Sequence, residues 1–164
     1  MATAKTKTLY LLRHAKSGHE EHIGNDIERH LSAKGYKEAE EQSAWFNRNH
    51  AKPELIVSSP AIRAFTTALI FSKHLNYAVE DIEINSSIYE ASVQRLLYLI
   101  KELDDKFKTV MLVGHNPGFT DLTNVLCGNV LPDLPTAHIA EIDLSVERWS
   151  EVDYGKGKLF IKGV

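Results

Sequence analysis

Five polar residues are of types that together could act on a phosphoryl group: Arg13, His14, Arg63, Glu90 and His115. A guanidinium group stays charged and can bind two phosphoryl oxygens at once. A neutral imidazole can attack phosphorus and form a covalent intermediate, and a protonated imidazole can donate a further hydrogen bond. A carboxyl group can protonate a leaving group and then activate water. Any one of these residues alone is more simply explained as an ordinary polar residue, so the hypothesis depends on the fold placing them together.

The elements that would position these residues are short apolar runs separated by helical patterns. Strands are predicted at 8–13, 55–57, 82–84 and 109–113, the third being the weakest because its isoleucines alternate with acidic residues. Alternation of strands and helices is typical of α/β proteins with a parallel sheet. The carboxyl ends of parallel strands meet at one edge of such a sheet, where ligands bind. The candidate residues follow the four strands in this order: Arg13 with His14, Arg63, Glu90 and His115.

The helices are predicted from capping residues and apolar spacing. Ser32 is a suitable N-cap for a helix that reaches about Arg48. Ser59 and Pro60 are suited to start the next helix, with Ile62, Phe65 and Leu69 facing the core. Further helices are predicted at about 92–104 and after Pro117, and late strands at 138–144 and 158–164, possible edge strands. The polar segment 14–31 is predicted to be a long loop beside the site.

Length and composition restrict the class of protein. The 164 residues predict one domain spanning 1–164, with 43% hydrophobic and 25% charged residues, as in ordinary globular proteins. The net charge of −3 and the lack of a basic block argue against a nucleic-acid partner. The apolar runs are too short to cross a membrane. A single cysteine, Cys127, and an N-terminus without an apolar signal segment predict a cytoplasmic protein.

Four stretches of the sequence resemble the motifs of a known family. The stretch LLRHAKS at 11–17 resembles the N-terminal signature of the histidine phosphatase superfamily, also called phosphoglycerate mutase-like, and most of all its small SixA-like phosphohistidine phosphatase branch. Three further stretches agree in order and spacing: RHLSAKG at 29–35, SSPAIRA at 58–64 and VGHNPG at 113–118. The resemblance covers nearly the whole chain. Ala15 replaces the glycine that is usual in the superfamily, a variant that looks normal for the SixA-like branch.

The resemblance implies a fold and roles for individual residues. The fold would be a three-layer α/β/α sandwich whose mostly parallel sheet has one antiparallel strand near an edge. His14 would be the nucleophile, and Arg13, Arg63 and His115 would form the phosphate pocket. Glu90 lies in the region where many members have an acid, although SixA-like members do not all use one. Arg29 is a further candidate for the pocket.

The function expected from residues and resemblance together is that of a metal-independent phosphatase with a phosphohistidine intermediate. Its substrate would be phosphohistidine in a protein of the histidine-containing phosphotransfer type, because the chain has little spare length for segments that roof the site. The alternatives are a small-molecule phosphomonoesterase of the same superfamily and a non-catalytic module that binds phosphorylated partners. No cofactor is expected. A metal site from His19, His22 and His30 is conceivable, but their spacing matches no strong template, and solvated loop histidines are the simpler explanation.

Overall fold

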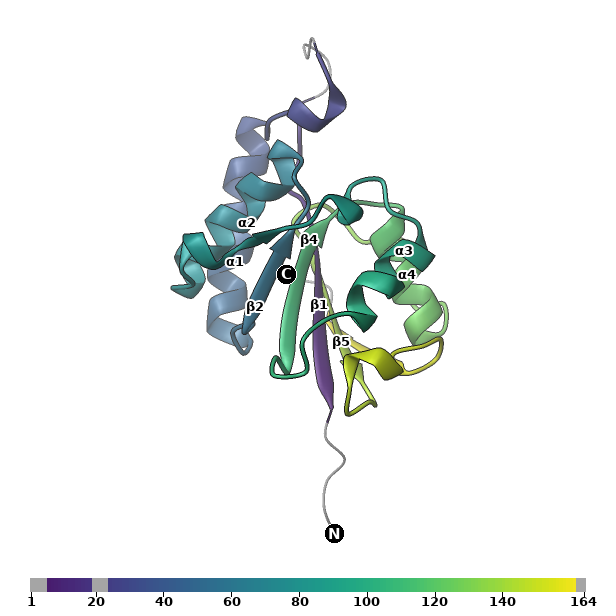
Figure 1. Cartoon of the computed structure of the whole chain (residues 1–164). Helices are drawn as coiled ribbons and strands as arrows, with labels where there is room; N and C mark the ends of the chain where they lie inside the picture. Colours follow the sequence, from purple (N-terminus) through teal and green to yellow (C-terminus); the bar gives the residue numbers. More distant parts are fainter. Residues whose placement is uncertain (1–5, 19–23, 162–164) are drawn as a thin grey trace.

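A six-stranded sheet forms the middle layer of the computed structural model, which describes residues 6–18 and 24–161 (Figure 1). Its strands are β1 (Lys7–Arg13), β2 (Leu55–Ser58), β3 (Glu83–Ile84), β4 (Thr109–Gly114), β5 (Ile139–Leu144) and β6 (Gly157–Ile161). The order across the sheet is β3-β2-β4-β1-β5-β6. The first four of these run parallel, and β5 is antiparallel to both of its neighbours. The prediction of one antiparallel strand near an edge is confirmed.

Helices cover both faces of the sheet. The helices α1 (Ala33–Asn49) and α2 (Ile62–Leu75) lie on one face, and α3 (Val93–Lys101) and α4 (Gly118–Cys127) lie on the other (Figure 1). Successive side chains of a strand point to opposite faces, so the central strands bury apolar residues on both sides. In β1, Tyr10 and Leu12 join the core beneath α1 and α2, whereas Leu9 and Leu11 join the core beneath α3 and α4.

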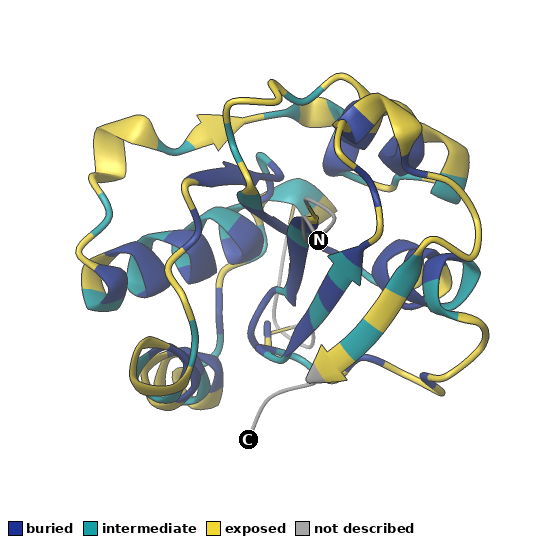
Figure 2. Cartoon of the chain, turned by 90° about the horizontal axis from the view of Figure 1, so that it is seen from below, coloured by how far each residue is buried: buried dark blue, intermediate teal, exposed yellow. Residues whose placement is uncertain are grey.

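The resulting three-layer sandwich confirms the α/β fold expected from the alternating sequence pattern. Buried residues follow the central strands and the inner faces of the helices, while exposed residues lie on the outer faces of the helices (Figure 2). No helix in the described ranges 6–18 and 24–161 combines the length and the apolar character needed to cross a membrane.

The start of α1 is placed tightly against the segment that follows β1. The Ser32 side chain accepts a hydrogen bond from the Gly35 N–H at 3.0 Å, which confirms the predicted N-cap. A β-carbon at Gly35 would overlap the backbone carbonyl of Lys16, so only glycine allows this approach. The Ser32 N–H also donates to the Lys16 carbonyl at 2.9 Å. These contacts fix the residues just after His14 against the first turn of a long helix.

The prediction for α2 was wrong in its start and in its buried face. The helix begins at Ile62 with Ala61 as its N-cap, two residues later than expected. Its buried residues include Arg63, Thr67 and Phe71, whereas the residues predicted to face inward are only partly buried. Small alanines allow α2 to lie close to the sheet, and the helix is rotated so that Arg63 and Thr67 face the end of β1. The larger apolar side chains of α2 do not mark its buried face, so their spacing predicted the wrong rotation.

Candidate active site

The ends of β1 and β4 place the two candidate histidines side by side. Arg13 of β1 pairs with Gly114 of β4 in parallel register, and the His14 N–H donates to the Gly114 carbonyl at 3.0 Å. The rings of His14 and His115 then lie with their centroids 5.3 Å apart. A β-carbon at Gly114 would approach side-chain atoms of Ile88 and Phe119 within 2.7 Å, so a glycine is needed directly before His115.

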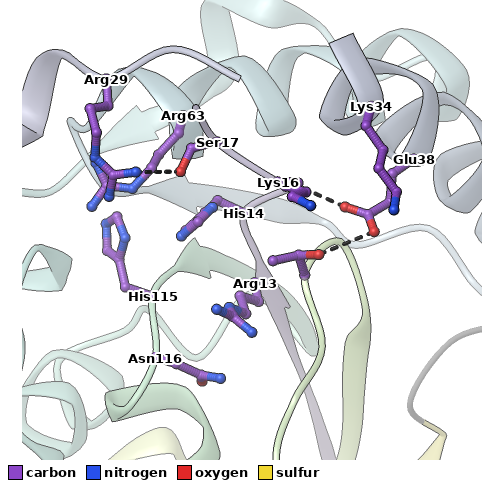
Figure 3. Close-up of a pocket in the computed structure, with 11 residues that line it drawn as sticks. Arg13, His14, Lys16, Ser17, Arg29, Lys34, Glu38, Arg63, His115 and Asn116 are labelled. Atoms are coloured by element: carbon purple, nitrogen blue, oxygen red, sulfur yellow. Dashed lines mark hydrogen bonds between the residues drawn. The ribbon is translucent and has the colours of Figure 1, made fainter. Parts of the chain in front are cut away.

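A cavity of about 520 Å³ lies over these strand ends (Figure 3). It is lined by Arg13, His14, Lys16, Ser17, Arg29, Lys34, Glu38, Arg63, His115, Asn116 and Thr136. Four of the five predicted residues are therefore brought together in one cavity, and Arg29 joins them. Figure 3 shows the two histidines and the three arginines around a common space, with Lys34 and Glu38 farther along the cavity.

His14 is held in one tautomer by a hydrogen bond to the backbone. Its Nδ1 lies 2.7 Å from the carbonyl oxygen of Ala15. A carbonyl oxygen can only accept, so Nδ1 must carry the hydrogen and the neutral ring has its lone pair on Nε2. The Ala15 N–H in turn donates to the Thr67 hydroxyl at 3.0 Å, so α2 fixes the residue that orients the imidazole. The arrangement presents Nε2 as a nucleophile.

The pKa values of both histidines are low enough to keep the two rings neutral near pH 7. Burial lowers the pKa of His14 to about 4, and the charges of Arg63 and Arg13 act in the same direction. Burial also lowers the pKa of His115 to about 3, with further contributions from His14 and Arg63. A bound phosphate dianion would favour the protonated form of His115, because an opposite charge stabilises a cation. His115 would therefore become a cationic donor only once an anion is bound.

Arg63 and Arg29 are oriented by Asp26, a residue that the sequence reasoning did not single out. Arg63 is 6% exposed, and its two terminal nitrogens contact the Asp26 carbonyl at 2.7 Å and Oδ2 at 2.9 Å. Arg29 contacts Oδ1 of the same carboxylate at 2.9 Å and donates to the Ser17 hydroxyl at 2.6 Å. The spacing Asp26-x-x-Arg29 is typical of an ion pair on one helical turn and was the available signal.

Arg13 reaches the cavity from the other side and is anchored by the loop before β5. Its Nη1 donates to the Leu134 carbonyl at 2.9 Å and lies 3.8 Å from Asp133 Oδ2. Asn116 donates to the same Leu134 carbonyl, also at 2.9 Å. Arg13 precedes His14 and Asn116 follows His115, so one carbonyl oxygen holds a sequence neighbour of each histidine. This shared anchor links the end of β1 to the end of β4.

Ser59 contacts His115, a role in the site that was not predicted from the sequence. Its hydroxyl lies 2.7 Å from His115 Nε2 and also accepts from the Ala61 N–H at 3.2 Å. The His115 Nδ1 is buried and has no hydrogen-bond partner within the described part of the chain. Ser59 was expected to cap α2, but Ala61 holds that position.

Glu90 lies apart from the nucleophile. It is exposed, has a left-handed backbone φ of 54°, and lines a second cavity of about 450 Å³. This second cavity shares Arg63, His115 and Asn116 with the first but does not include His14. The structure therefore brings Glu90 to the neighbouring cavity and not to the one that contains His14.

A metal ion has no evident site in the described ranges, where no group of three or more His, Cys, Asp or Glu side chains is suitably placed. Of the three loop histidines considered for a metal, His19 and His22 lie outside the described residues.

Comparisons with known proteins agree with the fold and the motifs. A model of the histidine phosphatase superfamily (branch 1) matches residues 9–93. A protein of Agrobacterium tumefaciens assigned as the phosphohistidine phosphatase SixA is 30% identical, with a TM-score of 0.75, and the match covers 84% of this chain and 92% of that chain. A structure of the protein histidine phosphatase SixA with tungstate is 21% identical and shares the fold, with a TM-score of 0.79 over 95% of this chain and 96% of that chain. An uncharacterised protein of Mycobacterium leprae is 25% identical over 162 residues, which covers 90% of this chain and 96% of that protein.

The matched stretch of the family model contains the strand end that presents His14 and the helix that presents Arg63. It spans 85 of the 164 residues, from 9 to 93, and the SixA relative at 30% identity extends the likeness over most of the chain. The protein is therefore a phosphatase of the histidine phosphatase superfamily, within which it resembles the SixA-like branch.

Proposed function

We propose that the protein is a metal-independent phosphatase that transfers a phosphoryl group to His14 and then to water. The observation that carries the proposal is the position of His14 Nε2, which faces a cavity lined by three arginines while Nδ1 is fixed by the Ala15 carbonyl. A pKa of about 4 keeps this nitrogen unprotonated and nucleophilic at neutral pH. Positioning and charge stabilisation account for most of the catalysis of phosphoryl transfer.

In the first step, the lone pair of His14 Nε2 forms a bond to phosphorus. The bond from phosphorus to the leaving atom breaks, and its electron pair departs with the leaving group, which takes up a proton from solvent or from a nearby acid. Arg13 and Arg63 stabilise the negative charge on the equatorial oxygens, and a protonated His115 donates to one of them. Arginines thus supply the charge that a metal ion supplies in other phosphatases.

In the second step, a water oxygen attacks the phosphorus of the phosphohistidine. The bond between phosphorus and Nε2 breaks, its electron pair returns to the imidazole, and the water loses a proton to solvent or to a nearby base. The products are inorganic phosphate and free His14 in its original tautomer, because Nδ1 stays bonded to the Ala15 carbonyl. The same three cations stabilise both steps.

The second cavity is the natural place for the leaving group. In-line displacement requires the leaving group to depart on the side of phosphorus opposite to His14. Arg63 and His115 line both cavities, so a phosphoryl group between them would have the nucleophile on one side and the 450 Å³ cavity on the other. Glu90 lines that second cavity and could protonate a poor leaving group there. Asp26 lines it as well, but its pKa lies far below the usual value, so it cannot supply a proton at neutral pH.

The preferred substrate class is phosphohistidine exposed on a protein. An imidazole leaves readily once protonated, which reduces the need for a strong general acid and agrees with the exposed position of Glu90. Lys16 and Lys34 on the cavity wall are exposed, as a partner docking beside the cavity requires. A partner of the histidine-containing phosphotransfer type and a cytoplasmic location remain predictions.

The substrate class can be tested by comparing kcat/KM for a phosphorylated histidine-containing phosphotransfer domain with a panel of sugar phosphates. We expect a preference for the protein substrate, and we expect Glu90→Gln to reduce hydrolysis of alkyl phosphate esters more than hydrolysis of phosphohistidine. A clear preference for one sugar phosphate, with equal losses on both substrates in Glu90→Gln, would favour the small-molecule phosphatase. Binding of the phosphorylated domain with no turnover of it or of p-nitrophenyl phosphate would favour the non-catalytic module.

A further inference from the structure

Asp26 forms hydrogen bonds with two of the arginines that line the cavity, Arg29 and Arg63. It lies in the short 3-10 helix Asp26–Glu28. Its Oδ1 accepts from Arg29 at 2.9 Å, and its Oδ2 accepts from Arg63 at 2.9 Å and from the Tyr89 hydroxyl at 2.6 Å. Its backbone carbonyl accepts a second hydrogen bond from Arg63 at 2.7 Å. One residue thus connects two cavity arginines that come from different elements.

These contacts fix the charge state of the group. The hydrogen bond from the Tyr89 hydroxyl is the largest cause that holds the pKa of Asp26 well below its usual range. Burial opposes this shift, and Arg29 and Arg63 each lower the pKa further. The same hydrogen bond raises the pKa of Tyr89 to about 12, so the phenol keeps its proton and remains a donor. Asp26 is therefore an anion, and Tyr89 a neutral donor to it, over the whole range in which the enzyme would work.

The bonds to Asp26 leave Arg63 with unused donors. Each terminal nitrogen of a guanidinium group carries two hydrogens, and Asp26 takes one from each. The Arg63 Nε is buried and has no hydrogen-bond partner within the described part of the chain. A planar group that is bonded along one edge can rotate little, so the direction of its remaining hydrogens is set before the substrate arrives.

We propose that Asp26 is a positioning residue that orients Arg63 and Arg29 toward the transferring phosphoryl group. The inference rests on the proposed function, since it assigns these arginines to the phosphoryl oxygens. Asp26 acts in two opposite ways. Its negative charge would oppose an anion bound by these arginines and weaken ground-state binding, whereas its fixed geometry favours the transition state.

The two effects can be separated with Asp26→Asn, which keeps the shape and an acceptor oxygen but removes the charge. We expect kcat for p-nitrophenyl phosphate to fall about 10-fold, less than the 10²–10³ typical when a preorganised donor is removed outright. We expect inhibition by inorganic phosphate to stay equal or become tighter, because a repulsive charge is gone. A loss in kcat without a loss in anion affinity would not result from general loosening of the cavity.

Glu28→Gln is the matched control, because Glu28 lies in the same short helix, is exposed and lines neither cavity. It removes one exposed negative charge from the same short helix and should change neither kcat nor phosphate inhibition. Tyr89→Phe removes one hydrogen bond from Asp26 and keeps those between Asp26 and the arginines. It should lower kcat about two- to threefold, because a single hydrogen bond contributes little to holding Asp26 in place. The melting temperature of each variant shows that it is folded.

The inference is overturned if Asp26→Asn keeps kcat within twofold of the wild type. It is also overturned if kcat and phosphate affinity fall in parallel, since that result indicates a structural role alone. These outcomes differ from failure of the proposed function, in which the wild-type protein itself would turn over no phosphorylated substrate. An active wild type with an unaffected Asp26→Asn variant would reject only the positioning role.

Discussion

The pKa of His14 can be tested by changing the pH of the free enzyme. Burial and the neighbouring arginines lower this pKa from 6.5 to about 4. At pH 5, a pKa of about 4 leaves about 90% of the imidazole neutral, whereas a pKa of 6.5 would leave about 3%. The two cases therefore differ about 30-fold in the concentration of the nucleophilic form. We expect His14 to remain almost entirely neutral down to pH 5.

The assay is a pH titration of the histidine Cε1–Hε1 signals by NMR in the absence of substrate. The chain has eight histidines, so the signal of His14 is assigned by its loss in His14→Asn. Measuring the free enzyme avoids the second ionisation of the substrate phosphate, which falls near pH 6 and would distort a rate profile. A midpoint near 6.5 would refute the reasoning, because it would mean that burial does not act on this ring.

A second variant shows whether burial or the charge of Arg63 lowers the pKa of His14 more. Arg63→Met removes one positive charge but keeps most of the packing around His14. We expect the pKa of His14 to rise in this variant yet to stay below 6.5, because burial is the largest cause and the charge of Arg63 a smaller one. A return to 6.5 in Arg63→Met would mean that the arginine dominates.

Four further predictions follow from the contacts in and around the cavity. Arg13→Ala and Arg63→Ala should each lower kcat by about 10²–10³ with little change in melting temperature, because each removes a charged donor at a strand or helix end; near-normal rates would remove that arginine from the site. Ser59→Ala should lower kcat about 5- to 10-fold, since it removes a hydrogen bond worth about 1 kcal/mol from His115, and an unchanged rate would assign Ser59 to structure alone. Excess EDTA should leave the rate steady, and a loss that Mg²⁺ or Zn²⁺ restores would contradict a mechanism that uses arginines for charge. The free energy of unfolding, measured in urea, should fall as the pH drops from 6.5 toward 4, by up to about 3 kcal/mol for His14. In this range the unfolded chain binds a proton on His14 and the folded state does not, so the proton favours unfolding. An unfolding free energy that does not change with pH would contradict a buried neutral ring.

The sequence predicted the residues of the cavity that directly follow strands. Arg13, His14 and His115 come at or directly after the ends of buried strands, and a parallel sheet brings those ends together whatever the loops do. The order of helices and strands could also be predicted, because short apolar runs that alternate with helical patterns form few structures other than an α/β sheet. The N-cap at Ser32 followed from local chemistry and was confirmed.

Features that depend on how distant segments meet could not be predicted from one sequence. Asp26 reaches Arg63 across 37 positions, and nothing local indicates the contact. The rotation of α2 depends on packing against α1 and the sheet, so the spacing of its apolar residues was misleading. Glu90 was grouped with the other site residues because it follows the third strand, but β3 has only two residues, Glu83 and Ile84. The connection after such a short strand leaves Glu90 at the second cavity.

The central claim is that one defined nitrogen of His14 carries the phosphoryl group during turnover. Its most direct test is to quench the enzyme in alkali during turnover of a phosphodonor and to identify the adduct by mass spectrometry and ³¹P NMR. Because Nδ1 is bonded to the Ala15 carbonyl, the account predicts phosphorylation of His14 at Nε2, stable in base, labile in acid and absent from His14→Ala. Phosphorylation at Nδ1 or at another residue, or full turnover by His14→Ala, would contradict it.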